Sequence, residues 1–305
     1  MLNQDKLISL LACPDCKAEL QSLSNCDACA IIFQSSDGTP ALFPQKANRT
    51  VSFQFTPDRS TPSDVFRAAL SYPIRRGAAA SGDPYHLDLA HIDILKSLPT
   101  GSSVLEIGCG GGQMRRWIVD KGHSYIGTDI STSRIYDFLK EHGGPDVLCD
   151  AHFLPFRDGK FDVVYSAAVT EHLACPFLVA QEVERVLKPG GYYLGNVSFL
   201  EPWHDDSYFH MSPLGVFENL TQARFEAKNI WPGQGYSGFH AVMAMGNKVT
   251  KPLAFLGDLM YFAYRSGNTL RNLAKRRPNW SIDRIEDAAR VSGATDWIAQ
   301  KPLRG

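Results

Sequence analysis

Short apolar runs that end in glycine or in an acidic residue recur through the middle of the chain. Ser103–Ile107 (SVLEI) leads into a cluster of glycines, Ser124–Asp129 (SYIGTD) ends in an acid, and Phe161–Ser166 (FDVVYS) is mostly apolar. Runs of this kind are typical of strands that are buried in a parallel sheet. Residues 85–98 carry apolar side chains at helical spacing, and a helix is expected to begin near Met114. The alternation predicts an α/β fold.

The glycine cluster after the first run has a definite spacing. It reads Glu106-x-Gly108-x-Gly110-x-Gly112, with Gln113 where the dinucleotide-binding fingerprint GxGxxG requires its last glycine. Glycine supplies the positive backbone angles of a tight turn and lets a ligand approach the main chain. The following helix start offers free N–H groups to a polar or anionic ligand. The pattern disfavours a nicotinamide cofactor, and a glycine turn of some other α/β protein is the alternative interpretation.

This stretch resembles motif I of the class I S-adenosylmethionine-dependent methyltransferases, and further marks follow in the order of that family. Asp129 stands 21 residues after Gly108, close to the spacing of an acid that binds ribose hydroxyls. Val186–Asn196 (VLKPGGYYLGN) is similar to the turn and fifth strand of the family. The resemblance covers residues 104–196 and implies a doubly wound, Rossmann-like sheet of seven strands that binds S-adenosylmethionine. The implied cofactor-binding residues are Glu106, Gly108, Gly110, Gly112, Asp129, Asp150, Ala151 and Ser166.

Residues 1–45 are predicted to form a separate unit around two CxxC pairs, with cysteines at positions 13, 16, 26 and 29. Four thiolates at this spacing suit tetrahedral Zn²⁺, and so short a segment buries little core without a metal. Reduced thiols without metal are the alternative, and a redox pair is disfavoured because no βαβ pattern surrounds it. The predicted zinc ligands are Cys13, Cys16, Cys26 and Cys29.

The same segment resembles a known small protein beyond its cysteines. Leu11–Lys17 and Phe33–Leu42 are similar to the zinc-ribbon activator subunit of tRNA and protein methyltransferases. The segment carries more acidic than basic residues, which disfavours direct binding to RNA. A docking or stabilising role is expected instead.

The rest of the chain is divided by composition. Residues 46–84 are expected to be a linker, helical at 64–70 and closing over the cofactor at 77–82. The methyltransferase domain is expected to span residues 85–248. Within it, Ser212 and Pro213 predict a helix start, and Phe225–Ile230 with Phe239–Met245 predict a closing β-hairpin. Residues 249–305 are expected to form a C-terminal helical extension.

The loop after the fifth strand, residues 198–211 (SFLEPWHDDSYFHM), is the predicted acceptor side of the site. It leaves the carboxyl end of a strand, where open α/β sheets bind ligands. His204 is the first candidate for the base that takes a proton from an acceptor, followed by His210 and Asp206. A metal site of His204, Asp205 and His210 and a solvated surface loop are the alternatives.

Three further histidines are interpreted differently. His172, in Glu171-His172-Leu173, is expected to shape the cofactor pocket rather than to act as a catalyst. His86 and His91 are expected to be surface or packing residues.

Bulk properties limit the function classes. The chain has 305 residues, a net charge of −1 and a pI near 6.7, which disfavours a chain-wide nucleic-acid footprint. It has no apolar run of 18 residues and no signal-peptide pattern, so the cytoplasm is expected. Residues 252–264 are apolar and basic residues follow to position 277. Such a helix is expected either to pack in a core or dimer or to make peripheral contact with a membrane.

The prediction from sequence is therefore a methyltransferase that uses S-adenosylmethionine and carries a structural zinc ribbon. The expected acceptor is an oxygen or nitrogen nucleophile of a small molecule, sugar or lipid-linked compound, because the loop at 198–211 is aromatic and acidic. Methylation of rRNA or tRNA is the rival enzymatic function. A non-catalytic binding partner with the same fold is the rival from another class.

Overall fold

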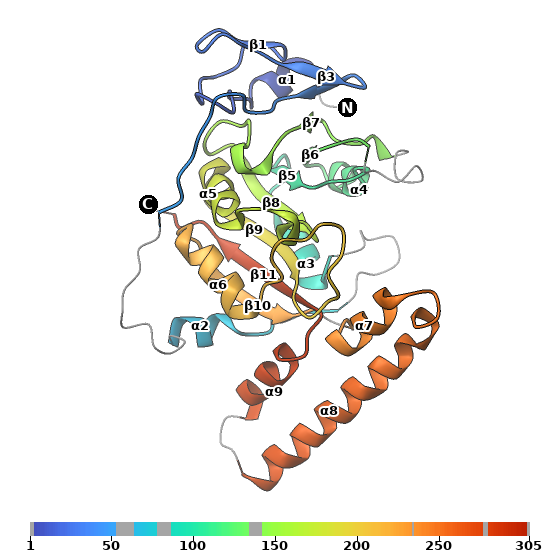
Figure 1. Ribbon diagram of the computed structural model, residues 1–305. Coiled ribbons are helices and arrows are strands. Elements are labelled where there is room, and N and C mark those ends of the chain that lie inside the picture. The colour runs from blue at the N-terminus through green and yellow to red at the C-terminus, as the bar shows by residue number, and fades with distance from the viewer. Residues whose placement is uncertain are drawn as a thin grey trace.

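A single sheet runs through the molecule in the computed structural model, which describes residues 3–52, 64–77, 87–133, 142–233, 235–276 and 280–303 (Figure 1). Within these ranges the sheet has nine strands, in the order β10-β11-β9-β8-β5-β6-β7-β4-β3. A separate two-stranded ribbon, β1 (Asn25–Cys26) with β2 (Ile31–Ile32), lies in the N-terminal segment.

The centre of the sheet is parallel. It consists of β5 (Ser103–Ile107), β6 (Ser124–Asp129), β7 (Val147–Leu148), β8 (Phe161–Ala167) and β9 (Leu187–Ser198). The middle positions of β5 and β8 are fully buried, as their near-continuous apolar sequences require. The carboxyl ends of these strands therefore meet at one edge, where the polar and glycine-rich segments follow.

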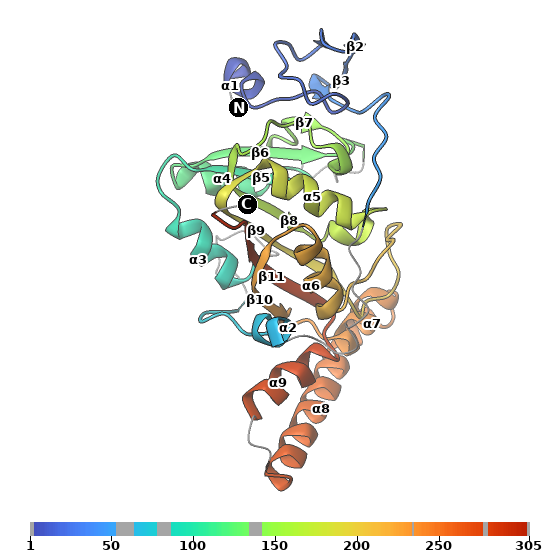
Figure 2. The same cartoon turned by 90° about the vertical axis from the view of Figure 1, so that its left-hand side faces the viewer.

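Helices cover both faces of this parallel core (Figure 2). Helices α3 (Leu89–Ser97) and α4 (Met114–Asp120) lie on one face, and α5 (Pro176–Val186) and α6 (Pro213–Gln222) lie on the other. Helix α6 begins as expected, because the hydroxyl of Ser212 accepts a hydrogen bond from the Gly215 N–H. The doubly wound, Rossmann-like arrangement is confirmed.

The sixth strand along the domain, β10 (Glu226–Pro232), does not pair with residues 239–245. Those residues belong to helix α7 (Gly238–Gly246), which Ser237 caps by accepting a hydrogen bond from the His240 N–H. The partner of β10 is β11 (Ala294–Gln300), which lies antiparallel between β10 and β9. The prediction of a strand at Phe239–Met245 is wrong, because a helix cap precedes it and Trp297 fills the core position from farther along the chain.

The chain after residue 248 is therefore more than a helical extension. Helices α7, α8 (Ala254–Ala274) and α9 (Trp280–Ala289), with a short 3₁₀ turn η4 (Lys251–Leu253), are inserted between β10 and β11 and project from the end of the sheet (Figures 1 and 2). None of the helices within the described ranges is long and apolar enough to cross a bilayer.

The N-terminal segment extends the main sheet. After α1 (Gln4–Ile8) and the β1–β2 ribbon, β3 (Gln34–Ser36) and β4 (Thr39–Ala41) form a hairpin whose second strand pairs parallel with β7. The N–H of Leu42 donates to the carbonyl of Leu148 at 2.8 Å, and the Leu42 side chain is fully buried. The segment therefore covers an edge of the sheet that is otherwise unpaired among the described strands.

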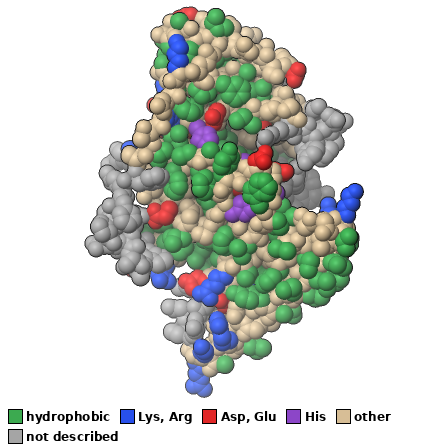
Figure 3. All heavy atoms as spheres, viewed as in Figure 1, with side chains coloured by type: hydrophobic (Ala, Val, Ile, Leu, Met, Phe, Trp, Pro, Cys, Tyr) green, Lys and Arg blue, Asp and Glu red, His purple; other side chains and the backbone are tan. Residues whose placement is uncertain are grey.

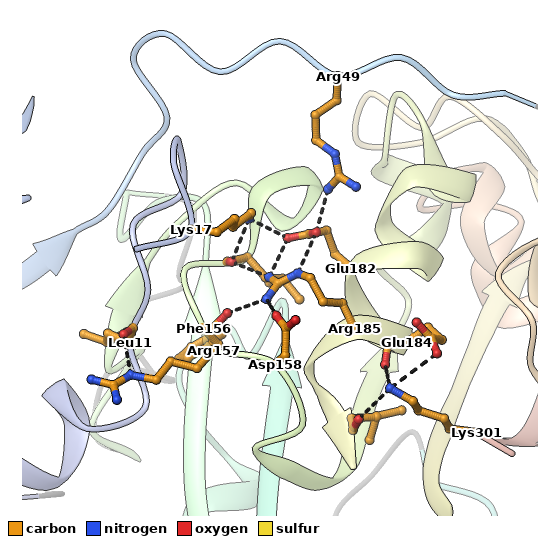
Figure 4. Close-up of polar contacts among 12 residues, drawn as sticks. Leu11, Lys17, Arg49, Phe156, Arg157, Asp158, Glu182, Glu184, Arg185 and Lys301 are labelled. Carbon is orange, nitrogen blue, oxygen red and sulfur yellow. Dashed lines mark hydrogen bonds and ion pairs between the residues drawn. The ribbon is translucent and has the colours of Figure 1, made fainter. Parts of the chain in front are cut away.

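A buried carboxylate fastens this segment to helix α5 (Figure 4). The side chain of Glu182 is 1% exposed and receives three cations: Lys17 at 2.9 Å, Arg49 at 2.6 Å and Arg185 at 2.8 Å. Burial opposes ionisation of Glu182, but these cations hold the pKa of its carboxyl below the usual value. Lys17 and Arg49 come from the N-terminal region and Arg185 from α5, so this cluster joins the two parts of the chain.

The next described element, helix α2 (Asp64–Ala69), lies at the end of the sheet opposite the N-terminal segment (Figure 1). Its bounds are close to those of the helix predicted at 64–70. Phe66 of this helix packs edge-on against Phe217 of α6, with ring centroids 5.4 Å apart. Residues 78–82 of the segment expected at 77–82 to close over the cofactor, and His86, lie outside the described residues.

Candidate functional site

The glycine loop after β5 has the backbone that its spacing predicts. Gly108, Gly110 and Gly112 all have positive φ, at +68°, +52° and +82°. A Cβ on Gly108 would lie 2.3 Å from a methyl carbon of Val169, and one on Gly112 would lie 3.0 Å from the Gly144 carbonyl oxygen. The end of β8 and the loop after β6 therefore leave no room for a Cβ at these two positions. The turn needs glycine for its positive φ and for this lack of space.

Asp129, at the end of β6, is joined directly to this loop. One of its carboxylate oxygens accepts a hydrogen bond from the Gly110 N–H at 2.9 Å, and the other accepts from the Ile130 N–H. The carboxylate is partly exposed and keeps further lone pairs for a ligand. The predicted glycine and acid therefore lie side by side at the carboxyl ends of β5 and β6.

Glu106 lies beneath the loop rather than in an open cleft. Its carboxyl is 8% exposed and accepts a hydrogen bond from the Tyr125 hydroxyl. Burial raises the pKa of Glu106 to about 8, so the neutral form dominates at neutral pH. Its position supports a role in holding the loop.

Asp150 and Ala151 follow β7 and begin the 3₁₀ turn η2 (Ala151–Phe153). Asp150 accepts hydrogen bonds from the backbone N–H of His152 and from its ring Nδ1, at 2.9 and 2.6 Å. The ring Nε2 of His152 in turn accepts from the Cys175 N–H at 3.0 Å, which places the ring proton on Nδ1. Sequence reasoning missed His152, whose only signal was its position beside the Asp-Ala pair.

Ser166 is less open than predicted. Its side chain is 2% exposed, and its hydroxyl lies 3.4 Å from those of both Thr170 and Tyr193. The hydroxyl therefore belongs to a buried polar cluster behind the ends of β8 and β9.

The segment after β8 and the loop after β9 meet opposite the glycine loop. The backbone carbonyl of Glu171, in the 3₁₀ turn η3 (Thr170–His172), accepts hydrogen bonds from the N–H groups of Tyr208 and Phe209 at 2.6 and 3.1 Å. The loop at 198–211 thus folds back over Glu171, two residues beyond Val169.

Three imidazoles gather where this loop meets η3. The ring centroids of His172 and His204 are 5.5 Å apart, and those of His204 and His210 are 5.7 Å apart. The Nδ1 of His204 lies 2.9 Å from the Pro202 carbonyl oxygen, which can only accept. His204 therefore carries its proton on Nδ1 when neutral, which leaves Nε2 as an acceptor. His210 bonds the Ser207 hydroxyl at 3.0 Å.

Two carboxyl groups lie beside the imidazoles, the buried Glu171 and the half-buried Glu201, and the sequence analysis did not propose Glu201. The hydroxyl of Ser198 is 2.7 Å from both Glu171 and Glu201. A hydroxyl has one proton to donate, so one of the two carboxyls must itself be protonated. Burial raises the pKa of the Glu201 carboxyl above its usual value.

Glu171 is fully buried, and its second oxygen, Oε2, has no hydrogen-bond partner among the described residues. Ligand atoms of Glu171, His172 and His204 all lie within 4.8 Å of one another. These three side chains can take a proton from the molecule to be methylated, or they can bind a cation. The sequence analysis identified the Glu171–His172 pair but assigned His172 only to the cofactor pocket.

The other candidates of the loop lie at its surface. Asp205 and Asp206 are exposed in a turn and have positive φ, at 42° and 59°. The ring of Trp203 is also largely exposed, although its N–H donates to the Ser207 carbonyl at 2.9 Å. His91, by contrast, is fully buried and bonds the Trp297 carbonyl at 3.0 Å, so it is a packing residue as expected.

The four N-terminal cysteines lie together. The sulfurs of Cys13 and Cys29 are 3.7 Å apart and those of Cys16 and Cys26 are 3.6 Å apart, with all four within 4.8 Å of one another. Tetrahedral bonds of about 2.3 Å to Zn²⁺ require sulfurs about 3.8 Å apart, so these thiols fit that metal. The cluster is a possible metal site.

Comparison with known proteins places this geometry in context. A family model described as a methyltransferase domain matches residues 105–195. A 2-methyl-6-phytyl-1,4-hydroquinone methyltransferase from Synechocystis sp. is 40% identical over 103 residues, which are 32% of each chain. A tRNA (carboxymethyluridine(34)-5-O)-methyltransferase from Xenopus tropicalis is 39% identical over 112 residues, which are 36% of this chain and 17% of that protein.

A solved SAM-dependent methyltransferase structure from Methanosarcina mazei is 19% identical, with a TM-score of 0.45, over 73% of this chain and 100% of that one. The chain spans about a third of the length of the hydroquinone methyltransferase and less than a fifth of that of the tRNA methyltransferase. The family match begins in β5 and ends in β9, so it includes the glycine loop, Asp129, Asp150 and Glu171. Residues 105–195 therefore match a methyltransferase domain, and the chain has a Rossmann-like α/β fold.

Proposed function

We propose that this protein transfers a methyl group from S-adenosylmethionine to an oxygen or nitrogen atom of a small-molecule, sugar or lipid-linked acceptor. The observation that carries the proposal is the joining of the cofactor loop to the Glu171–His172–His204 cluster through Val169, which touches Gly108. A methyl donor on one side and proton acceptors on the other are the two requirements of this reaction.

The chemistry is a displacement at the sulfonium-bound methyl group. The acceptor atom forms the new bond to carbon while the carbon–sulfur bond breaks, and the sulfur keeps the electron pair. The acceptor's proton passes to Nε2 of His204, which the Nδ1 bond to Pro202 leaves without a proton and which lies 3.8 Å from a carboxyl oxygen of Glu201. Gly108, Gly110, Gly112, Asp129, Asp150 and Ala151 would hold the cofactor, and Glu106 would hold the loop. The protein contributes alignment and exclusion of water.

The surface around the cluster supports an acceptor that is not a polyanion. Asp205 and Asp206 are exposed at the loop, Glu201 is half-buried, and Glu171 is fully buried. Phosphate backbones require basic contacts, which this loop does not carry. The similarity to a tRNA methyltransferase favours RNA as a second candidate, and the acidic loop opposes it.

The cysteine cluster has a separate role in this proposal. Cys13, Cys16, Cys26 and Cys29 would hold a structural Zn²⁺ that keeps the ribbon folded against β7 and α5. The position of the ribbon in the same chain parallels an activator subunit that stabilises its methyltransferase. The metal lies in the N-terminal segment and takes no part in methyl transfer.

The test is a labelling experiment that sorts the acceptor by class. The full chain is incubated with methyl-tritiated S-adenosylmethionine and, separately, with a lipid extract, a soluble metabolite pool and total tRNA. We expect label in the lipid extract or in the soluble metabolite pool. This label should be lost when the His204→Ala variant is used. Label confined to tRNA would overturn the acceptor class. Absence of label from every fraction, with the cofactor still bound, would overturn the enzymatic proposal.

A further inference from the structure

Helix α8 presents its apolar side chains to the outside. Phe262 is 71% exposed and Leu259 59% exposed, although both lie in the middle of a 21-residue helix. Only Gly257 and Asn272 of this helix are buried. The exposed apolar residues of the helix are Phe255, Leu256, Leu259, Met260, Phe262, Leu270 and Leu273.

The spacing of these residues defines one face. With 3.6 residues per turn, Phe255, Leu259, Phe262 and Leu273 fall within about a sixth of the circumference, and Leu256 and Leu270 adjoin them. The opposite side, around Gly257 and Asn272, packs on the protein. The sequence pattern alone did not resolve two faces, and burial now separates them.

Contacts with α7 and α9 hold the helix in this orientation. A Cβ on Gly257 would lie 2.5 Å from the Phe239 carbonyl oxygen of α7, so the two backbones are in close contact. Asp258 bonds His240 of α7 at 2.9 Å. Asn272 donates to Asp287 of α9 at 3.4 Å. The helix therefore cannot rotate its apolar face inward without losing these contacts.

The apolar surface continues toward the candidate acceptor site. Val242 and Val249 are exposed beside α8, and a Cβ on Gly238, at the start of α7, would lie 2.7 Å from Leu200 of the site loop. Trp203, Tyr208 and Phe209 of that loop are exposed as well. Figure 3 shows hydrophobic side chains gathered over the α7–α8 region, on the same face as His and acidic side chains at its middle.

Basic residues flank this surface at both ends. Lys248 and Lys251 precede α8, and Arg271, Lys275 and Arg276 follow its apolar middle, all exposed. The only acidic residue between positions 248 and 276 is Asp258, which is paired with His240. A chain with a net charge of −1 thus concentrates positive charge around its largest exposed apolar helix.

We propose that the outward face of α7 and α8 binds the surface of an anionic lipid bilayer, with α8 lying flat in the headgroup region. An apolar face of about 30 Å flanked by basic residues matches the physics of interfacial helices. A second copy of this chain fits less well, because either parallel or antiparallel pairing would place basic ends against basic ends. The inference does not depend on the identity of the methyl acceptor.

The experiment is flotation of the full-length protein with lipid vesicles, at physiological salt. One set contains phosphatidylglycerol and phosphatidylcholine, and the other contains phosphatidylcholine alone. Variants are Leu259→Glu with Phe262→Glu, and Lys275→Glu with Arg276→Glu. The matched controls are Val119→Glu, an exposed apolar position on α4, and Arg116→Glu with Lys121→Glu at the same helix. Size-exclusion chromatography with light scattering gives the oligomeric state.

Wild-type protein and both controls should bind the anionic vesicles, and each α8 variant should bind on the order of tenfold more weakly or worse. All positions are exposed, so melting temperatures should stay close to wild type. Equal binding to both vesicle types, or equal binding by controls and α8 variants, would overturn the proposal. A wild-type dimer that ignores vesicles and becomes a monomer in the Leu259→Glu, Phe262→Glu variant would assign the face to a second copy instead.

Discussion

His172 and His204 face each other edge to face, with ring centroids 5.5 Å apart and planes at 87°. One follows β8 and the other belongs to the loop after β9, so only the parallel pairing of these strands brings them together. The contact places the Glu171–His172 pair beside His204, the predicted base.

His204→Ala should lower turnover by roughly 10²–10⁴-fold while leaving cofactor affinity nearly unchanged, because a general base acts only in the chemical step. Trp203→Ala should instead mainly raise the KM for the acceptor. Steady-state kinetics on the acceptor fraction that takes label, beside calorimetry of cofactor binding, measures both. Wild-type turnover in both variants would mean that the loop is a surface connection only.

Asp129→Ala should weaken binding of S-adenosylmethionine by about 1–3 kcal/mol, through lost hydrogen bonds to the ribose and a loosened Gly110 turn. The matched control is Asp120→Ala, an exposed acid at the end of α4. Isothermal calorimetry should also show no binding of NAD, because Gln113 interrupts the dinucleotide spacing. Tighter binding of NAD than of S-adenosylmethionine would contradict the assignment.

Removal of metal should destabilise the N-terminal segment in the full chain. Wild-type protein is expected to contain one zinc per chain, and a Cys26→Ser, Cys29→Ser variant is expected to contain none. Chelation should lower the melting temperature of wild type toward that of the variant. Metal-free wild-type protein whose melting temperature ignores chelation would rule out a structural site.

Glu182→Ala should cost about 3–5 kcal/mol of folding stability, because it leaves Lys17, Arg49 and Arg185 without their shared carboxylate. Glu184→Ala is the control on the same helix, since Glu184 is partly exposed and pairs with Lys301 at 3.3 Å. Denaturant unfolding compares the two. Limited proteolysis should cut the N-terminal segment faster in the Glu182 variant alone, and equal losses would show that the cluster does not hold this segment.

The folding stability of the wild-type protein should fall as pH rises, and Glu106→Gln should reduce this loss. The pKa of Glu106 is about 8 in the folded chain and about 4.3 when unfolded, so the folded state binds more protons between these values. The free energy of unfolding therefore falls as pH rises through this window. Melting curves at pH of about 5 and about 8 should show that the melting temperature of the variant rises relative to that of wild type at the higher pH. A constant difference would place the ionised form of Glu106 in the folded protein.

Local chemistry in the sequence was sufficient to predict the glycine turn after β5. Gly108, Gly110 and Gly112 are required by their positive φ, and the strand that precedes them is apolar because both of its faces are covered. The Ser212 cap likewise depends on neighbours within three residues. Such features are specified by backbone sterics and short-range hydrogen bonds, so they can be predicted without knowledge of distant segments.

Only the tertiary structure decided which distant segments pair. Residues 294–300 complete the sheet in place of 239–245, and β4 joins β7 because each strand edge takes the partner that best covers it. The apolar pattern of α8 was visible in the sequence, but its outward direction follows from the contact of Gly257 with Phe239. Burial is a property of the whole packing arrangement, so the same side chains serve as core or as interface according to what the rest of the chain leaves uncovered.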